Sequence, residues 1–92
     1  MIERELLVVN KDGIHLRPAE RIAQTAGGFA SEVSLQNGTC KVNGKSILGI
    51  LALEAGLGTR VTVVADGPDE QEAVEAIAAL FQEGFGEELG KL

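Results

Sequence analysis

The residues best suited to chemistry in this sequence lie together, in the run Gly13-Ile14-His15-Leu16-Arg17-Pro18-Ala19. His15 is the only histidine of the chain, and Arg17 follows it two positions later. A neutral imidazole is a nucleophile near pH 7, and a guanidinium offers a planar set of donors that matches a phosphoryl group. The pair therefore predicts a histidine that carries a phosphoryl group, beside an arginine that binds the oxygens of that group.

The local sequence places His15 at the start of a helix. Asp12-Gly13 is a turn signal, and Pro18 suits a first helical turn because it lacks an N–H and has a fixed φ. The first N–H groups of a helix have no intrahelical partner and attract anions together with the macrodipole. They also disfavour a cationic imidazole, so we expect His15 to be neutral. The alternative is that His15 is a plain surface or capping residue and Arg17 a solvated helix residue.

Composition predicts one domain over residues 1–92, with a core built from aliphatic residues and alanine. The net charge of −6 argues against nucleic-acid binding. The first residues are too charged for a signal peptide, and no apolar run is long enough to cross a membrane. One cysteine, Cys40, cannot form an internal disulfide, and one His with one Cys cannot assemble a typical metal site. We therefore expect a cytoplasmic protein without membrane insertion, metal or cofactor.

Hydrophobic periodicity and turn signals divide the chain into four strands and three helices. The strands are predicted over 2–9, 31–36, 39–43 and 60–65. The helices are predicted from His15 to Gly27-Gly28, over 47–53, and from Asp69 to Gly84. The order β-α-β-β-α-β-α is typical of an α+β fold, a two-layer sandwich with helices packed on one face of an antiparallel sheet.

Single residues at the ends of these elements carry further expectations. Cys40 shares a strand face with Val42, so we expect a small buried side chain rather than a reactive thiol. Asp69 is expected to cap the third helix, with Glu72 completing a capping box. The tail 85–92 is rich in Gly and Glu and is expected to fray.

Ser46 is well placed as the N-cap of the second helix. Gly44-Lys45-Ser46 is also similar to the end of a phosphate-binding P-loop, but Thr39 stands where that motif requires its earlier glycine. The chain is too short for a nucleotide-binding βαβ array as well. A P-loop is therefore not expected here.

The run 13–19 resembles the active-site signature of the HPr family, the phosphocarriers of the bacterial phosphotransferase system. That signature consists of Gly, an aliphatic residue, His, a small residue, Arg, Pro and Ala, and Leu16 departs from it at the small position. The resemblance extends from Ile2 to about Gly86. It implies an open-faced sandwich, in which three helices cover one face of a four-stranded antiparallel sheet of order 1-4-2-3.

The resemblance also implies a carrier rather than an enzyme. His15 would accept a phosphoryl group from enzyme I on its Nδ1 atom, as pros-phosphohistidine, and pass it to an enzyme IIA component. Arg17 would neutralise the phosphoryl oxygens. These partners are expected to dock on an apolar patch around His15, for which the candidates are Leu16, Ile47, Leu48 and Leu51.

Two further likenesses suggest regulation. Lys45-Ser46-Ile47-Leu48-Gly49 resembles the stretch in which many HPr proteins are phosphorylated on serine by an HPr kinase/phosphorylase, although Ser46 could equally be a plain N-cap. The segment 79–85 resembles the end of NPr, a nitrogen-linked paralogue with a regulatory pathway. The alternative function is therefore an HPr/NPr-like regulatory module that acts through its phosphorylation state and protein binding rather than in sugar transport.

Glu20 and Gln24 also make the rim of the site less positive than in many relatives, which weakens steering towards an acidic enzyme I.

Overall fold

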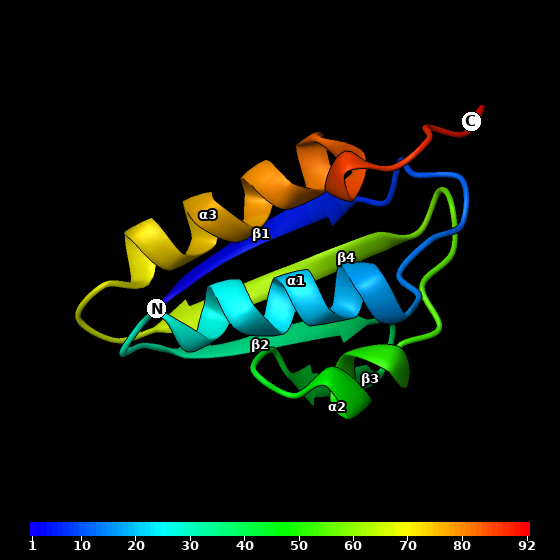
Figure 1. The fold of residues 1–92 in the computed structure, drawn as a ribbon. Coiled ribbons are helices and arrows are strands. Elements are labelled where there is room, and N and C mark those ends of the chain that lie inside the picture. The colour runs from blue at the N-terminus through cyan, green and yellow to red at the C-terminus, as the bar shows by residue number, and fades with distance from the viewer.

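Strands and helices follow one another along the chain in the predicted order. The structure, a computed structural model, describes residues 1–92. The elements are β1 (Ile2–Leu7), α1 (Leu16–Gly27), β2 (Glu32–Asn37), β3 (Cys40–Asn43), α2 (Ile47–Leu51), β4 (Arg60–Asp66), α3 (Glu70–Gln82) and a short 3-10 helix, η1 (Gly84–Gly86). The two long helices lie side by side over one face of the sheet, and α2 packs against α1 and β3 at one edge (Figure 1).

The sheet has the order β1-β4-β2-β3, and each neighbouring pair is antiparallel. This confirms the open-faced sandwich and the strand order that the family resemblance implies. The register places Leu6 opposite Val61 and Leu35 opposite Val63, all on the face that the helices cover. Because side chains alternate along a strand, this register turns Glu3 and Glu5 to the other face, as their spacing predicts.

The core lies between this face and the apolar stripes of α1 and α3. On α1 the predicted stripe of Ala19, Ile22, Ala23 and Ala26 is buried. Its three alanines let the helix approach the sheet closely, while larger residues of α3, such as Ile77 and Phe81, fill the adjoining space. Each fully buried Val, Leu, Ile or Phe side chain stabilises the fold by about 1.5–3 kcal/mol relative to its exposed form. The long helices are held on the sheet by this burial.

The structure contradicts the prediction that Cys40 is buried, since its side chain is exposed. Cys40 opens β3, the edge strand of only four residues, where it pairs with Asn37. Its Sγ lies 4.0 Å from the carbonyl oxygen of Ala52 at the end of α2, so Cys40 lies at the margin of the helical layer, while Val42 on the same face is half-buried. The alternation of apolar and polar residues identifies which face of a strand is turned to the helices, but it does not reveal where the helical layer ends.

Asp69 occupies the N-cap position of α3 but forms no capping hydrogen bond, so the predicted capping box is absent. Its carboxylate accepts hydrogen bonds from the hydroxyl and backbone N–H of Ser31 and from the backbone N–H of Ala30. It therefore ties the start of α3 to the turn before β2. A different carboxylate, that of Glu70 in the first turn of α3, accepts a hydrogen bond from the backbone N–H of Gly67 at 3.1 Å.

The prediction that the tail frays is also wrong. Phe85 is only 2% exposed and packs edge-on against Phe81, with ring centroids 4.9 Å apart. Beyond it, the backbone N–H of Lys11 donates to Glu88 and that of Gly90 donates to Val9. The tail consequently returns to the end of the molecule where α1 begins (Figure 1).

No helix in the structure combines the length and the apolar character needed to span a bilayer.

Replacing Asp69 by Asn is expected to lower the thermal unfolding midpoint at neutral pH. The hydrogen bonds from Ser31 and Ala30 lower the pKa of Asp69 below its ordinary value of 3.8. Its contribution to stability is therefore present above about pH 3.8 and is lost as the pH falls through the lowered pKa. Thermal melts at neutral pH and at strongly acidic pH should show a difference from the wild type that shrinks on acidification. Asp12→Asn, which changes an exposed carboxylate, is the control, and an equal difference at both pH values contradicts this account.

Candidate functional site

His15 is the N-cap residue of α1, with an extended backbone (φ −89°, ψ −162°). Its carbonyl oxygen accepts the first helical hydrogen bond, from the N–H of Ala19 at 3.0 Å. Its side chain makes no capping hydrogen bond, so the imidazole does not serve as a cap. The backbone N–H groups of Leu16 and Arg17 consequently point out of the helix without a partner, and Pro18 has no N–H to offer.

The turn before the helix is held in place by Gly13. Its φ is +69°, and a Cβ at this position would lie 2.6 Å from the carbonyl oxygen of Ala55. The next residue, Ile14, is buried and donates its backbone N–H to the same oxygen, at 2.8 Å. A glycine in a left-handed conformation is thus needed for the backbone to pass this close, and the contact fixes where His15 leaves the core.

The imidazole of His15 is partly exposed, at 44% of its side-chain area, and faces a carboxylate from the tail. Its Nε2 atom lies 2.9 Å from Oε1 and 3.0 Å from Oε2 of Glu87. Glu87 was not anticipated from the sequence, because the two residues lie 72 positions apart. The one signal was Phe85, a large apolar residue within a polar, glycine-rich tail, which indicates an anchored rather than a frayed segment.

Glu87 is itself held by Asn10, a second functional candidate that sequence reasoning missed. Asn10 is fully buried, and its Nδ2 donates to the carbonyl of Gly13 at 2.7 Å and to Oε1 of Glu87 at 3.0 Å. Burial by itself would raise the pKa of Glu87, but the hydrogen bonds from His15 and Asn10 and the nearby charge of Arg17 lower it below its usual 4.5. The carboxylate is therefore ionised at neutral pH.

Arg17 projects from the first turn of α1 into solvent, and its guanidinium makes no hydrogen bond or ion pair within the protein. It borders an open pocket of about 530 Å³ between α1 and the tail. The pocket is lined by Arg17, Glu20, Arg21, Gln24, Phe85, Gly86 and Glu87. Arg21 is not free in the same way, since its Nη1 donates to the carbonyl of Phe85 at 2.6 Å. Arg17 thus contributes the unpaired guanidinium beside His15.

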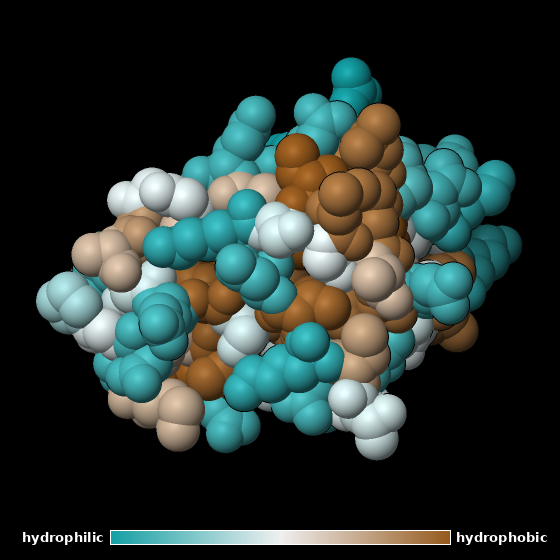
Figure 2. Space-filling model, turned by 90° about the horizontal axis from the view of Figure 1, so that it is seen from below, coloured by the Kyte–Doolittle hydropathy of each residue, from teal (hydrophilic) through white to brown (hydrophobic).

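Three of the four predicted docking residues are exposed. Leu16 lies next to His15, and Ile47 and Leu48 lie on the first turn of α2, where Leu48 is 81% exposed. Leu51 is partly buried and packs against the core, so it holds α2 on the domain and is not part of the exposed docking surface. Figure 2 shows hydrophobic side chains gathered on the face that carries α2. We call Leu16, Ile47 and Leu48 the apolar patch.

Ser46 is the N-cap of α2, and its Oγ accepts a hydrogen bond from the N–H of Gly49 at 3.1 Å, as predicted. The neighbouring Lys45 is already bonded: its Nζ donates to the carbonyl of Phe29 at 2.8 Å, and its backbone N–H donates to the side chain of Asn43. Ser46 therefore adjoins the apolar patch without a neighbouring free ammonium group.

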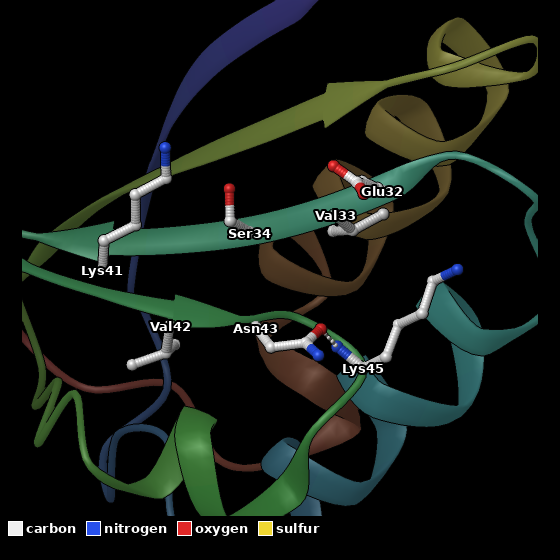
Figure 3. A pocket seen from close by; sticks show the side chains of 7 residues that line it. All are labelled: Glu32, Val33, Ser34, Lys41, Val42, Asn43 and Lys45. Atoms are coloured by element: carbon white, nitrogen blue, oxygen red, sulfur yellow. Dashed lines mark hydrogen bonds between the residues drawn. The ribbon is translucent and has the colours of Figure 1, made fainter.

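A second hollow, of about 410 Å³, lies between β2, β3 and the loop that leads to α2. Figure 3 shows its lining, in which Lys41 and Ser34 point away from α2 while Val42 points towards it. The lining residues are Glu32, Val33, Ser34, Lys41, Val42, Asn43 and Lys45. The hollow contains no histidine, and one of its two lysines is already bonded, so the chemistry is expected at His15 rather than here.

Comparison with known proteins identifies the family of this chain. Residues 2–83 match the family model described as the PTS HPr component phosphorylation site. The chain belongs to the HPr family. The phosphocarrier protein HPr of Cupriavidus necator is 44% identical over 87 residues, which cover 95% of this chain and 98% of the relative.

Solved structures of HPr proteins share the fold. The crystal structure of HPr-C-His from Thermoanaerobacter tengcongensis superposes with a TM-score of 0.92 at 43% identity, covering 97% of this chain and 100% of that one. The Bacillus subtilis catabolite repression containing protein Crh, which forms a swapped dimer in its crystal structure, superposes with a TM-score of 0.73 at 44% identity. That match covers 91% of this chain and 97% of Crh. The family is that of the phosphocarrier proteins of the phosphotransferase system. Glu87 lies beyond the segment that the family model matches.

The glycines at the two ends of α1 are expected to respond in opposite ways to alanine. Gly13→Ala should lower the free energy of unfolding by about 1–3 kcal/mol or more, because it combines a positive φ with a contact to backbone atoms. Gly27→Ala, in open space at the helix end, should leave stability unchanged or raise it by roughly 0.5–1 kcal/mol. Urea unfolding of both variants tests this, and a Gly13→Ala protein as stable as the wild type would contradict it.

Proposed function

We propose that this protein accepts a phosphoryl group from enzyme I on His15 and passes it to an enzyme IIA component. The observation that carries the proposal is the exposed imidazole of His15 beside two unpaired backbone N–H groups, those of Leu16 and Arg17, and an unpaired guanidinium.

The proposed reaction needs positioning and electrostatics more than covalent help. The Nδ1 lone pair of His15 attacks phosphorus while the bond to the donor's nitrogen breaks, and the phosphoryl oxygens turn to the N–H groups and the guanidinium. Each helix-end or surface charge interaction contributes roughly 0.3–1 kcal/mol, so the group is held without being trapped. Donor and acceptor are both histidines in this scheme, and the transfer is therefore readily reversible, as a carrier requires.

Enzyme I and enzyme IIA are proposed to dock on the apolar patch. Leu48 and Leu16 would be desolvated by a partner that covers His15, and each buried leucine contributes about 1.5–3 kcal/mol to such a contact. Leu16, which replaces the small residue of the family signature, enlarges the apolar area directly beside the reacting ring. Glu20 and Gln24 line the same pocket as Arg17 and make it less positive, so the docking relies more on apolar contact than on positive charge.

Ser46 is proposed as a regulatory phosphorylation site for an HPr kinase/phosphorylase. A phosphate at this N-cap would interact favourably with the start of α2 but would add up to about two negative charges beside Ile47 and Leu48. Like charges and a strongly hydrated group beside the apolar patch oppose the docking of an acidic partner. The likeness to Crh, a catabolite repression protein, favours the second candidate function, in which the chain acts as a regulatory module through Ser46.

Incubation with phosphoenolpyruvate and enzyme I is expected to give one phosphoryl adduct per chain. The adduct should be acid-labile, because it is a phosphohistidine, and it should be absent in His15→Ala. Mass spectrometry before and after acid treatment measures both properties. Ser46→Ala is the matched control and should be labelled like the wild type. A label that is acid-stable and maps to Ser46 alone would instead favour the regulatory module.

Arg17→Ala is expected to slow transfer from enzyme I about 10- to 100-fold while the domain stays folded. A charge-assisted hydrogen bond is worth about 1.5–3 kcal/mol, and the loss acts on the transition state. Rapid-quench measurement of adduct formation gives the rate. Arg4→Ala removes the same charge from an exposed site on β1 and should transfer at the wild-type rate. An Arg17→Ala rate equal to that of Arg4→Ala would remove Arg17 from the mechanism.

A further inference from the structure

The tail carries Glu87 to His15 between two separate anchors. Before Glu87, the buried Phe85 packs on Phe81, and its carbonyl accepts a hydrogen bond from Arg21. After Glu87, Leu89 forms a β-bridge with Asn10, and the N–H of Gly90 donates to Val9 at 2.9 Å. Both ends of the segment are thus fixed, and the Glu87 side chain is only 18% exposed. The two anchors therefore fix the position of the Glu87 carboxylate at the imidazole of His15.

The contact determines which ring nitrogen carries the proton. An ionised carboxylate only accepts hydrogen bonds, and both oxygens of Glu87 lie within 3.0 Å of Nε2 of His15. Nε2 must therefore bear the hydrogen. In a neutral imidazole the other nitrogen, Nδ1, then keeps its lone pair. Glu87 also shields Nε2 from an incoming phosphorus atom, so the free nucleophile of the ring is Nδ1.

The surroundings of Glu87 hold this arrangement at some expense of stability. Asn10 directs its amide nitrogen to Glu87 and Gly13, while its own Oδ1 is buried without any hydrogen-bond partner. A buried polar atom without a partner costs about 1–3 kcal/mol. A buried polar atom without a partner needs an explanation, and here the amide of Asn10 is turned so that its nitrogen reaches both Glu87 and Gly13.

We propose that Glu87 is a positioning residue for phosphoryl transfer: it keeps the proton on Nε2 of His15, directs the phosphoryl group to Nδ1, and stabilises the positive ring that the transfer creates. This inference rests on the proposed function of His15 as the phosphoryl acceptor. Glu87 would play the part that a buried aspartate plays behind a catalytic histidine, where the carboxylate orients the ring and stabilises its cation.

The charges balance without a proton leaving the ring. The lone pair of Nδ1 forms the bond to phosphorus, the bond between phosphorus and the donor nitrogen breaks, and its electron pair leaves with the donor. Because the proton stays on Nε2, the product ring is a phosphoimidazolium, whose positive charge faces the Glu87 carboxylate at 2.9 Å. When the group moves to the next histidine, the ring returns to its neutral form with the same proton still in place.

The first test uses the wild-type protein alone. Nitrogen-15 NMR of the imidazole, at a pH where the ring is neutral, should show a protonated Nε2, and its N–H proton should be observable because the hydrogen bond slows exchange with water. Glu87→Ala should lose that resonance. A wild-type ring that is protonated on Nδ1, or that has no observable Nε2–H proton, would overturn the proposal.

The second test measures the transfer itself with phosphoramidate, a small donor whose P–N bond breaks with release of ammonia. It requires no protein partner, so a change in docking cannot affect the result. Phosphorus-31 NMR distinguishes the two ring adducts and follows their rates. The wild type should be phosphorylated on Nδ1. Glu87→Gln keeps an acceptor for the Nε2 proton but not the charge, so it should still react on Nδ1, on the order of tenfold more slowly.

Glu87→Ala should be at least as slow and should also form the Nε2 adduct, because nothing then covers that nitrogen. Glu88→Gln is the matched control: it removes the same charge from the adjacent residue, whose carboxylate pairs only with Lys11, and should react like the wild type. Equal rates and the same Nδ1 adduct in all four proteins would overturn the proposal. If phosphoramidate gives the predicted pattern but enzyme I does not phosphorylate the wild type, the proposed function fails and the role of Glu87 stands.

Discussion

An α-helix cannot satisfy the N–H groups of its own first turn, and α1 leaves two of them unpaired beside the only histidine of the chain. The start of α2 also leaves two N–H groups without a partner, those of Ile47 and Leu48, but it differs from α1 in its N-cap side chain. At α2 the hydroxyl of Ser46 caps the helix, whereas His15 occupies the same position on α1 and makes no capping bond. A missing cap costs roughly 1 kcal/mol of stability. In return, the donors at the start of α1 are available to an anion.

The rest of the fold keeps that helix opening in one place. The sheet and α3 bury the alanine-rich stripe of α1, and the Gly13 turn presses against the backbone at Ala55, so neither the helix nor its entry can shift independently. The tail then supplies Glu87 from the opposite direction. The nucleophile is thus held by one long-range backbone contact on its N-terminal side and by one long-range carboxylate on its ring. Positioning of this kind is the main contribution that a protein can make to phosphoryl transfer.

The fold, and the position of His15 at the start of α1, were readable from local patterns. The stripe of α1, the alternation of β1 and β4 and the capping role of Ser46 are each specified within a few neighbouring residues, and all three agree with the structure. The features that were missed depend on contacts between distant parts of the chain. Asp69 binds the turn at Ser31 rather than its own helix, and Glu87 reaches His15 across 72 positions. The periodicity of neighbouring residues cannot predict contacts between such distant parts of the chain. The same holds for Cys40, whose exposure depends on where the helical layer ends above the sheet.

The central claim is that the unpaired N–H groups of Leu16 and Arg17 bind the phosphoryl group on His15. Amide proton–nitrogen spectra recorded before and after phosphorylation test it most directly. The account predicts that the amide protons of Leu16 and Arg17 move strongly downfield on hydrogen bonding to the phosphoryl oxygens, while the amide of Gly49, already bonded to Ser46, stays in place. Leu16 and Arg17 amides that keep their positions in the phosphorylated protein would contradict the account.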